Sequence, residues 1–149
     1  MIIQHKFEPD LNRLAARLKG DVQGSKRAGM INIVAAIEAR ARKDAPVRTA
    51  NLANTGTSDV NADATVGTVK FTAPYARHVH EGTGLYGPHK TLIVPKSKKA
   101  LYWPGAAHPM RAVKGMKGRP FLLDAAEQSD IEGLFIDGAE NFMKTRGTT

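Results

Sequence analysis

The side chains best suited to chemistry gather in the segment YARHVHEGTG, residues 75–84. It places His78, His80 and Glu81 within four positions, and histidine and glutamate are common zinc ligands. On a strand the two histidines would point to the same face, with Glu81 on the opposite one. A third ligand is not at hand, because His89 and His108 lie in a basic stretch that opposes a dication. The pattern favours a strand that ends in a turn at Glu81–Thr83 over a metal site.

Other catalytic patterns are also missing from the sequence. The four serines, Ser25, Ser58, Ser97 and Ser129, do not occur in a G-x-S-x-G elbow. The segment GTGLYG opens no predicted helix and lacks the GK[ST] of a phosphate loop. There is no cysteine, which excludes disulfides and thiolate metal ligands. We therefore expect no enzyme activity and no cofactor.

The net charge of +8 comes from one part of the chain. Residues 82–123 contain eight basic residues and no Asp or Glu, whereas the remaining positions hold 14 of each sign. Such a local excess indicates an acidic partner, either nucleic acid or protein, with a solvated loop as the plainer alternative. The eight are Lys90, Lys96, Lys98, Lys99, Arg111, Lys114, Lys117 and Arg119.

Apolar spacing predicts the elements that would carry these residues. Helices are expected at 8–20 and 25–46, the second with Ser25 as its cap and a buried stripe. After a loop over 46–67, alternation predicts a half-buried strand within 65–73, and two short strands, 91–94 and 100–103, suggest a hairpin with KSKK at its tip. A helical turn from Pro120 and a final helix over 130–146 follow a glycine-rich loop. The stripe consists of Met30, Ile33, Val34, Ile37 and Ala41.

This order predicts an α+β fold in which N-terminal and C-terminal helices pack on a small, mainly antiparallel sheet with an extended hairpin or loop. A length of 149 residues suits one domain, 1–149, with a basic extended loop region at 82–119. No signal peptide or membrane-spanning run is apparent, so we expect a soluble cytoplasmic product.

Four segments, in this order, resemble the gene-product-ten-like tail-component family of long-tailed phages. DAPVRTANL (44–52) is similar to its A-P-V-x-T-G-x-L signature, and PYARHVHEGT (74–83) to its Y-A-x-x-V-E-x-G-T segment. KKALYWP (98–104) and HPM…GRPFLLDAA (108–126) resemble its later strand and its P-F-L segment. Ala50, the pair His80–Glu81 and Met110 depart from that pattern. The positions within these segments that are expected to be structural are Pro46, Thr49, Leu52, Tyr75, Ala76, Glu81, Gly82, Thr83, Pro120 and Phe121.

The resemblance implies a structural virion protein of a tailed phage, located in the neck or tail after assembly in the host cytoplasm. It implies a ring, expected as a hexamer, that completes the tail or joins it to the head. Its partners would be further copies, neck or head-completion proteins, and tail-tube or tail-terminator proteins. A tail terminator or minor tail protein is an alternative within this class, and a small basic nucleic-acid-binding protein is an alternative outside it.

The basic residues are the expected interface with those partners. We expect most of them to meet acidic surfaces of neighbouring protein rings, with a subset near genomic DNA in the lumen. No membrane contact is expected. The interface residues are Lys96, Lys98, Lys99, Arg111, Lys114, Lys117 and Arg119.

Overall fold

The computed structural model describes residues 2–9, 21–46 and 51–146. Contacts divide the chain into two compact units. Pro74–Pro120 forms one, here called the hairpin unit, and Ile2–Ala73 with Phe121–Thr149 forms the other, the helix–sheet unit. The segment 82–119, predicted as an extended loop, lies within the hairpin unit. The helix predicted at 8–20 lies almost wholly outside the described residues.

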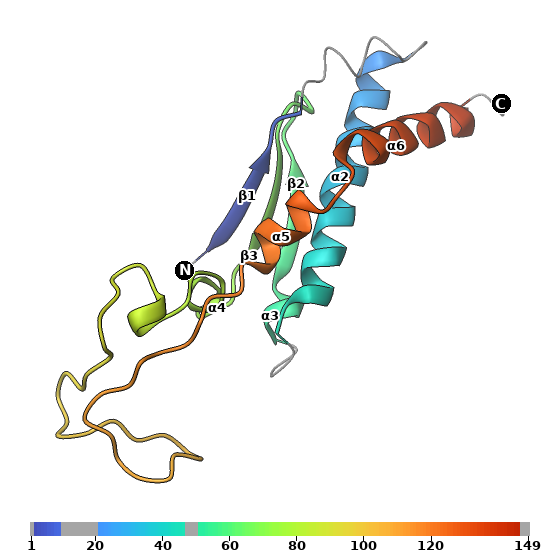
Figure 1. Ribbon diagram of the computed structural model, residues 1–149. Coiled ribbons are helices and arrows are strands. Elements are labelled where there is room, and N and C mark those ends of the chain that lie inside the picture. Colours follow the sequence, from blue (N-terminus) through green and yellow to red (C-terminus); the bar gives the residue numbers. More distant parts are fainter. Residues whose placement is uncertain (1, 10–20, 47–50, 147–149) are drawn as a thin grey trace. The chain divides into compact units, whose positions relative to one another are not determined.

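The helix–sheet unit contains a three-stranded antiparallel sheet, which confirms the predicted α+β class (Figure 1). Its strands are β1 (Ile3–Phe7), β2 (Gly56–Val60) and β3 (Gly67–Phe71), with β3 in the centre. Val69 and Phe71 of β3 are fully buried, as the alternation predicted. The side chains at the positions in between point away from this core. Gln4 and Lys6 of β1 and Thr57 and Asp59 of β2 are exposed.

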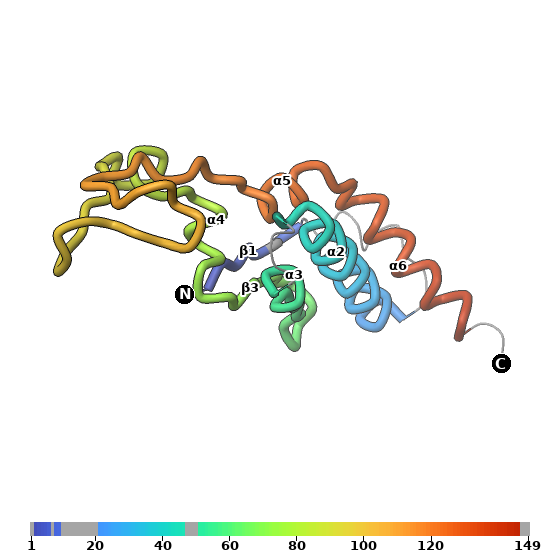
Figure 2. The backbone as a smooth tube through the Cα atoms, turned by 90° about the horizontal axis from the view of Figure 1, so that it is seen from below, coloured from blue at the N-terminus to red at the C-terminus, as the bar shows by residue number. Residues whose placement is uncertain are grey.

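Helix α2 (Val22–Asp44) forms the middle of this unit, between the sheet and α6 (Ile131–Arg146) (Figure 2). Its predicted apolar stripe is confirmed, since all five residues are buried. Met30 and Val34 touch β3 at Gly67, while Gly29 lies against the ring of Phe135 in α6. The Asn32 side-chain amide donates a 2.7 Å hydrogen bond to the backbone oxygen of Leu134. The predicted C-terminal helix is confirmed; Phe135 is fully buried and Ile131, Leu134 and Phe142 are half-buried.

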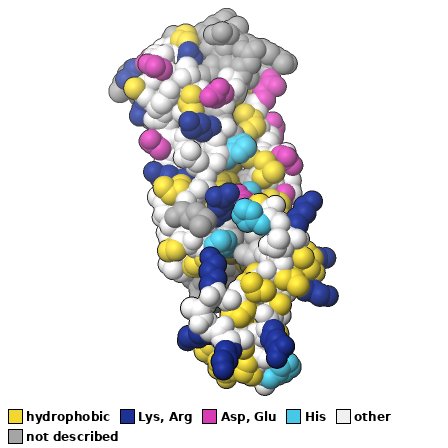
Figure 3. Space-filling view, turned by 90° about the vertical axis from the view of Figure 1, so that its left-hand side faces the viewer, with side chains coloured by type: hydrophobic (Ala, Val, Ile, Leu, Met, Phe, Trp, Pro, Cys, Tyr) yellow, Lys and Arg dark blue, Asp and Glu magenta, His cyan; other side chains and the backbone are white. Residues whose placement is uncertain are grey.

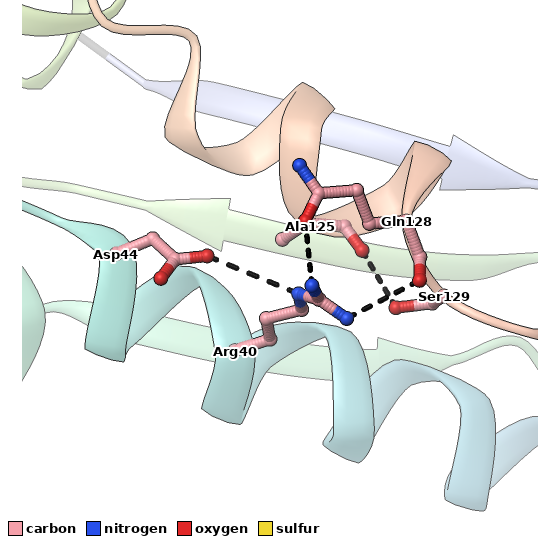
Figure 4. A network of polar contacts seen from close by, with 5 residues as sticks. All are labelled: Arg40, Asp44, Ala125, Gln128 and Ser129. Carbon is pink, nitrogen blue, oxygen red and sulfur yellow. Dashed lines mark hydrogen bonds and ion pairs between the residues drawn. The ribbon is translucent and has the colours of Figure 1, made fainter.

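The short helix α5 (Phe121–Glu127) begins directly after Pro120, as predicted, and packs on α2. The Phe121 ring meets Phe71 edge to face, with centroids 5.1 Å apart. At the other end, the Arg40 guanidinium donates hydrogen bonds to the backbone and side-chain oxygens of Gln128 (Figure 4). The Ser129 hydroxyl donates to the backbone oxygen of Ala125. These contacts fix the turn between α5 and α6.

Ser25 does not cap α2, contrary to prediction. Asp21 is the cap, since its carboxylate accepts a 2.9 Å hydrogen bond from the backbone N–H of Gly24. Ser25 is fully buried inside the helix, and its hydroxyl has no hydrogen-bond partner among the described residues. A buried hydroxyl without a partner loses its hydration and gains nothing in return.

We therefore expect Ser25→Ala to raise the free energy of unfolding by about 1 kcal/mol, because alanine removes the unpaired hydroxyl and favours the helix. Urea unfolding followed by circular dichroism measures the change. Ser129→Ala is the matched control, since it removes a hydroxyl that does donate a hydrogen bond. The control should be destabilised, and a loss of stability in both variants would contradict the assignment of Ser25.

The loop predicted over 46–67 is wrong for residues 51–60. It contains α3 (Asn51–Asn54), in which Leu52 is buried, and the edge strand β2. The Arg42 guanidinium donates to the backbone oxygen of Gly56 at 2.6 Å, which holds the start of β2. Only Gly56 and Val60 of β2 are buried. An edge strand with one row of polar side chains in water has too few apolar residues to be recognised by alternation.

Candidate interaction surface

The histidine segment is a helix, α4 (Ala76–Glu81), and not the predicted strand. The backbone N–H groups of Val79 and Gly82 donate to the oxygens of Tyr75 and His78, and Arg77 pairs with Glu81 at 2.8 Å. On a helix, residues two apart point in different directions, so His78 and His80 do not share a face. No group of three or more His, Cys, Asp or Glu that could hold a metal occurs among the described residues.

The rest of the hairpin unit is one long, irregular hairpin closed by three nested antiparallel bridges. Gly82 pairs with Lys117, Ile93 with Val113, and Leu101 with Met110. The predicted pairing of 91–94 with 100–103 is therefore wrong, because each of these segments pairs with the returning limb. The KSKK segment lies on the outgoing limb, and residues 102–109 form the tip.

Glycines allow the two limbs to approach closely at the base of the hairpin. Gly82, Gly84 and Gly115 have φ angles of 86°, 63° and 89°, which side-chain-bearing residues rarely adopt. A Cβ on Gly82 or Gly118 would lie 2.7 Å from backbone atoms of the opposite limb. The Thr83 hydroxyl accepts a 3.0 Å hydrogen bond from the N–H of Met116 across this crossing. The base is thus held by backbone contacts that only glycine permits.

The surface of the hairpin unit carries all eight basic residues of the 82–119 region, and every one is exposed. None forms an ion pair with a carboxylate of the described residues, although Lys117 lies over the Tyr86 ring at 5.8 Å. With Arg77 and Glu81 included, the unit has nine basic residues and one acidic residue, while the remainder of the chain has 13 of each. The unit is a concentrated positive surface.

Large apolar side chains are exposed on the same unit. Tyr102 and Trp103 at the tip are 68% and 44% exposed, and Leu92 and Val94 on the outgoing limb are 47% and 56% exposed. Figure 3 shows hydrophobic side chains interspersed with Lys and Arg in its lower part. Tryptophan, tyrosine and arginine are the residues that most often dominate binding energy at protein interfaces. We call this combination of exposed apolar and basic side chains the basic–apolar surface.

A cavity of about 660 Å³ lies within the hairpin unit. Its lining combines the Arg77 and Lys96 cations and the His78 and His89 imidazoles with an aliphatic wall of Leu92, Ile93 and Val94. The only acidic lining residue among those described, Glu81, is paired with Arg77. The cavity therefore suits an apolar group that carries negative charge beside it.

The motif residues that were expected to be structural lie in different settings. Leu52 and Phe121 are buried in the helix–sheet unit, and Pro46 follows the end of α2. Ala76 is buried and Tyr75 half-buried at the start of α4, and Glu81, Gly82 and Thr83 lead from α4 into the glycine crossing. Pro120 is exposed at the start of α5, and Thr49 lies outside the described residues.

Sequence reasoning missed the aromatic tip and the glycine crossing. Gly115 and Gly118 come 31 and 36 residues after Gly84 and Gly82, and that spacing alone gives no indication of pairing. The only local signal for the tip was Pro104–Gly105, a dipeptide typical of turns.

Comparison of the chain with protein-family models, curated proteins and solved structures gives no match. Within the parts of the chain that the structure describes, no helix has the length and apolar character needed to cross a membrane.

Proposed function

We propose that this chain is a structural protein of a tailed phage virion, a ring-forming connector between neck and tail tube. The basic–apolar surface carries the proposal, because eight exposed cations and several exposed apolar side chains lie on one acid-poor hairpin. Burial of the apolar side chains against a partner is the main favourable term in protein association, and the cations can pair with an acidic partner around them. The resemblance of four ordered segments to phage tail components supports the same role.

The form of the hairpin unit suits docking more than catalysis. Three nested bridges and a glycine crossing hold its base, while its limbs leave long stretches of backbone and side chain open to a neighbour. Exposed side chains along both limbs give a partner a large surface to contact. The proposed role needs no reacting group and no cofactor.

Protein is the better partner than DNA for most of the basic residues. A hexamer with the eight-charge excess in its lumen would bring about 48 positive charges close to passing DNA. Contacts to phosphates are strong at low salt, so such a lumen would retard the DNA it must release. Acidic surfaces of neighbouring protein rings would pair with the same basic residues without slowing the passage of DNA.

A complementation assay tests the connector role. Phage particles made without this chain should accumulate as unjoined heads and tails, and addition of the purified wild-type protein should restore joined, infectious particles. Electron microscopy counts the joined particles and plaque assays measure infectivity. Failure of the wild-type protein to restore joining would contradict the connector role.

Reversal of two charges tests the basic–apolar surface in the same assay. We expect Lys98→Glu/Lys99→Glu to reduce joining at least about tenfold, since like charges placed against an acidic surface weaken binding. Lys6→Glu/Lys43→Glu is the matched control: it makes the same change in net charge at exposed positions of the helix–sheet unit. Full joining by the first variant would contradict a protein interface at these lysines.

Nucleic-acid binding is the second candidate, favoured by the exposure of Tyr102 and Trp103 beside basic residues. It predicts tight binding of single-stranded or duplex DNA by the monomer, with affinity that falls steeply as salt rises. Fluorescence anisotropy with labelled DNA over a range of salt concentrations measures this. A connector should bind DNA only weakly at physiological salt.

A further inference from the structure

We infer that the basic–apolar surface of one copy docks on the outward acidic face of α5 and α6 of a second copy. This inference rests on the proposed function, because it names a partner for the same surface. It would join copies head to tail, and repetition of one such contact closes a ring when the rotation between copies allows it.

The acidic face is the counterpart of the basic region in both sequence and exposure. Residues 121–143 contain six Asp or Glu and no Lys or Arg. Glu127 of α5 and Asp137 and Glu140 of α6 are exposed. On α6, positions 137 and 140 lie on the side opposite the buried Phe135. The two helices therefore present negative charge away from the core they cover.

Several of these carboxylates are available for a partner. Glu140 pairs with Lys144 at 3.6 Å, and Asp130 accepts a hydrogen bond from the N–H of Gly133. Asp124, Glu127 and Asp137 have no ion pair or hydrogen bond from a side chain among the described residues. The eight basic residues of the 82–119 region likewise have no ion pair with a described carboxylate, so each surface lacks what the other supplies.

Apolar contacts match as well as charges. Leu123 of α5 is 38% exposed and lies next to Asp124, with Glu127 one turn further along. The cavity of the hairpin unit has an aliphatic wall of Leu92 and Val94 beside Lys96. An apolar side chain flanked by carboxylates is the group that this cavity suits. An ion pair at an exposed contact adds little to the free energy of binding. Removal of water from the apolar part of the contact adds to that free energy and strengthens the ion pairs beside it.

A second copy is a better occupant than the same chain. A contact between copies can repeat and build the ring of the proposed function, whereas a contact within one chain satisfies both surfaces and leaves nothing to dock.

Cross-linking tests the contact directly. Wild-type protein is mixed with an equal amount of heavy-isotope-labelled protein and treated with a carbodiimide, which joins lysine amines to carboxylates without a spacer. We expect linked peptides that connect Lys96, Lys98 or Lys99 with Glu127, Asp137 or Glu140 and that combine light and heavy chains. Linked peptides from single chains only, or none between these segments, would overturn the inference.

Charge exchange gives an independent readout. Lys98→Glu/Lys99→Glu and Glu127→Lys/Asp137→Lys should each weaken self-association by roughly tenfold or more in sedimentation experiments. Their equimolar mixture should associate like the wild type, because each reversed surface meets a reversed partner. A mixture no better than its components would overturn the contact. If the wild type joins particles but gives no mixed-isotope links, the contact between copies is overturned and the connector role stands. If it gives mixed-isotope links but does not join particles, the contact stands and the connector role is overturned.

Discussion

Phe135→Ala is expected to lower the free energy of unfolding by about 3–5 kcal/mol, the largest effect of any substitution considered for the helix–sheet unit. Phe135 of α6 is fully buried, and its ring lies against Gly29 of α2. Removal of the ring leaves a cavity that two packed helices can close only in part. Urea unfolding followed by circular dichroism measures the loss. Phe142→Ala on the same helix is the control, because Phe142 is only half-buried and should cost less.

The close approach at Gly29 makes the same contact testable from the other side. A Cβ on Gly29 would lie 2.6 Å from Cδ2 of Phe135, so Gly29→Ala should destabilise the wild type. In the Phe135→Ala background the overlap is gone, and the same substitution should cost much less. Equal costs in the two backgrounds would show that the two positions do not interact.

Gly115→Ala is expected to open the base of the hairpin unit. Its φ of 89° costs a side-chain-bearing residue about 1–2 kcal/mol, and the new Cβ would overlap the backbone of Thr83 and Gly84 on the opposite limb. Amide hydrogen exchange should accelerate by a factor of about 5–30 or more at Thr83 and Leu85, whose N–H groups donate across the crossing. Mass spectrometry or NMR measures those rates.

Gly105→Ala is the matched control for this prediction. Gly105 also has a positive φ, 96°, but a Cβ there would meet no atom within 4 Å. Gly105→Ala therefore introduces the strain of a positive φ without the overlap with a neighbouring backbone. It should accelerate hydrogen exchange only at the tip. Unchanged exchange at Thr83 and Leu85 in the Gly115 variant would contradict the role assigned to the crossing. Exchange in α2 should stay slow in both variants.

Local periodicity was sufficient where an element covers a continuous core. Helix α2 has apolar residues at helical spacing because one of its faces is buried along its whole length, and β3 alternates because one of its faces is buried. The starts of α5 and α6 follow from Pro120 and from Asp130, whose carboxylate accepts a hydrogen bond from the Gly133 N–H. These elements were predicted correctly.

Local pattern failed where residues distant in sequence decide the conformation. The segment 75–81 alternates weakly and was interpreted as a strand, yet it forms α4, with an Arg77–Glu81 pair four residues apart. The short apolar runs at 91–94 and 100–103 looked like partners because they are close in sequence. Each instead pairs with the returning limb, at Val113 and Met110.

The sequence by itself determined the α+β class, the main helices, the central strand and the acid-free basic region, because composition and periodicity record burial and charge directly. The expectation of a phage connector comes from motif resemblance, and it stays a proposal. Only the tertiary structure decided which limbs pair, that Tyr102 and Trp103 lie at the tip, and that glycines cross at the base. The physical reason is that these features depend on contacts between residues about 10–35 positions apart, and the loop-closure entropy of such contacts leaves no local pattern in the chain.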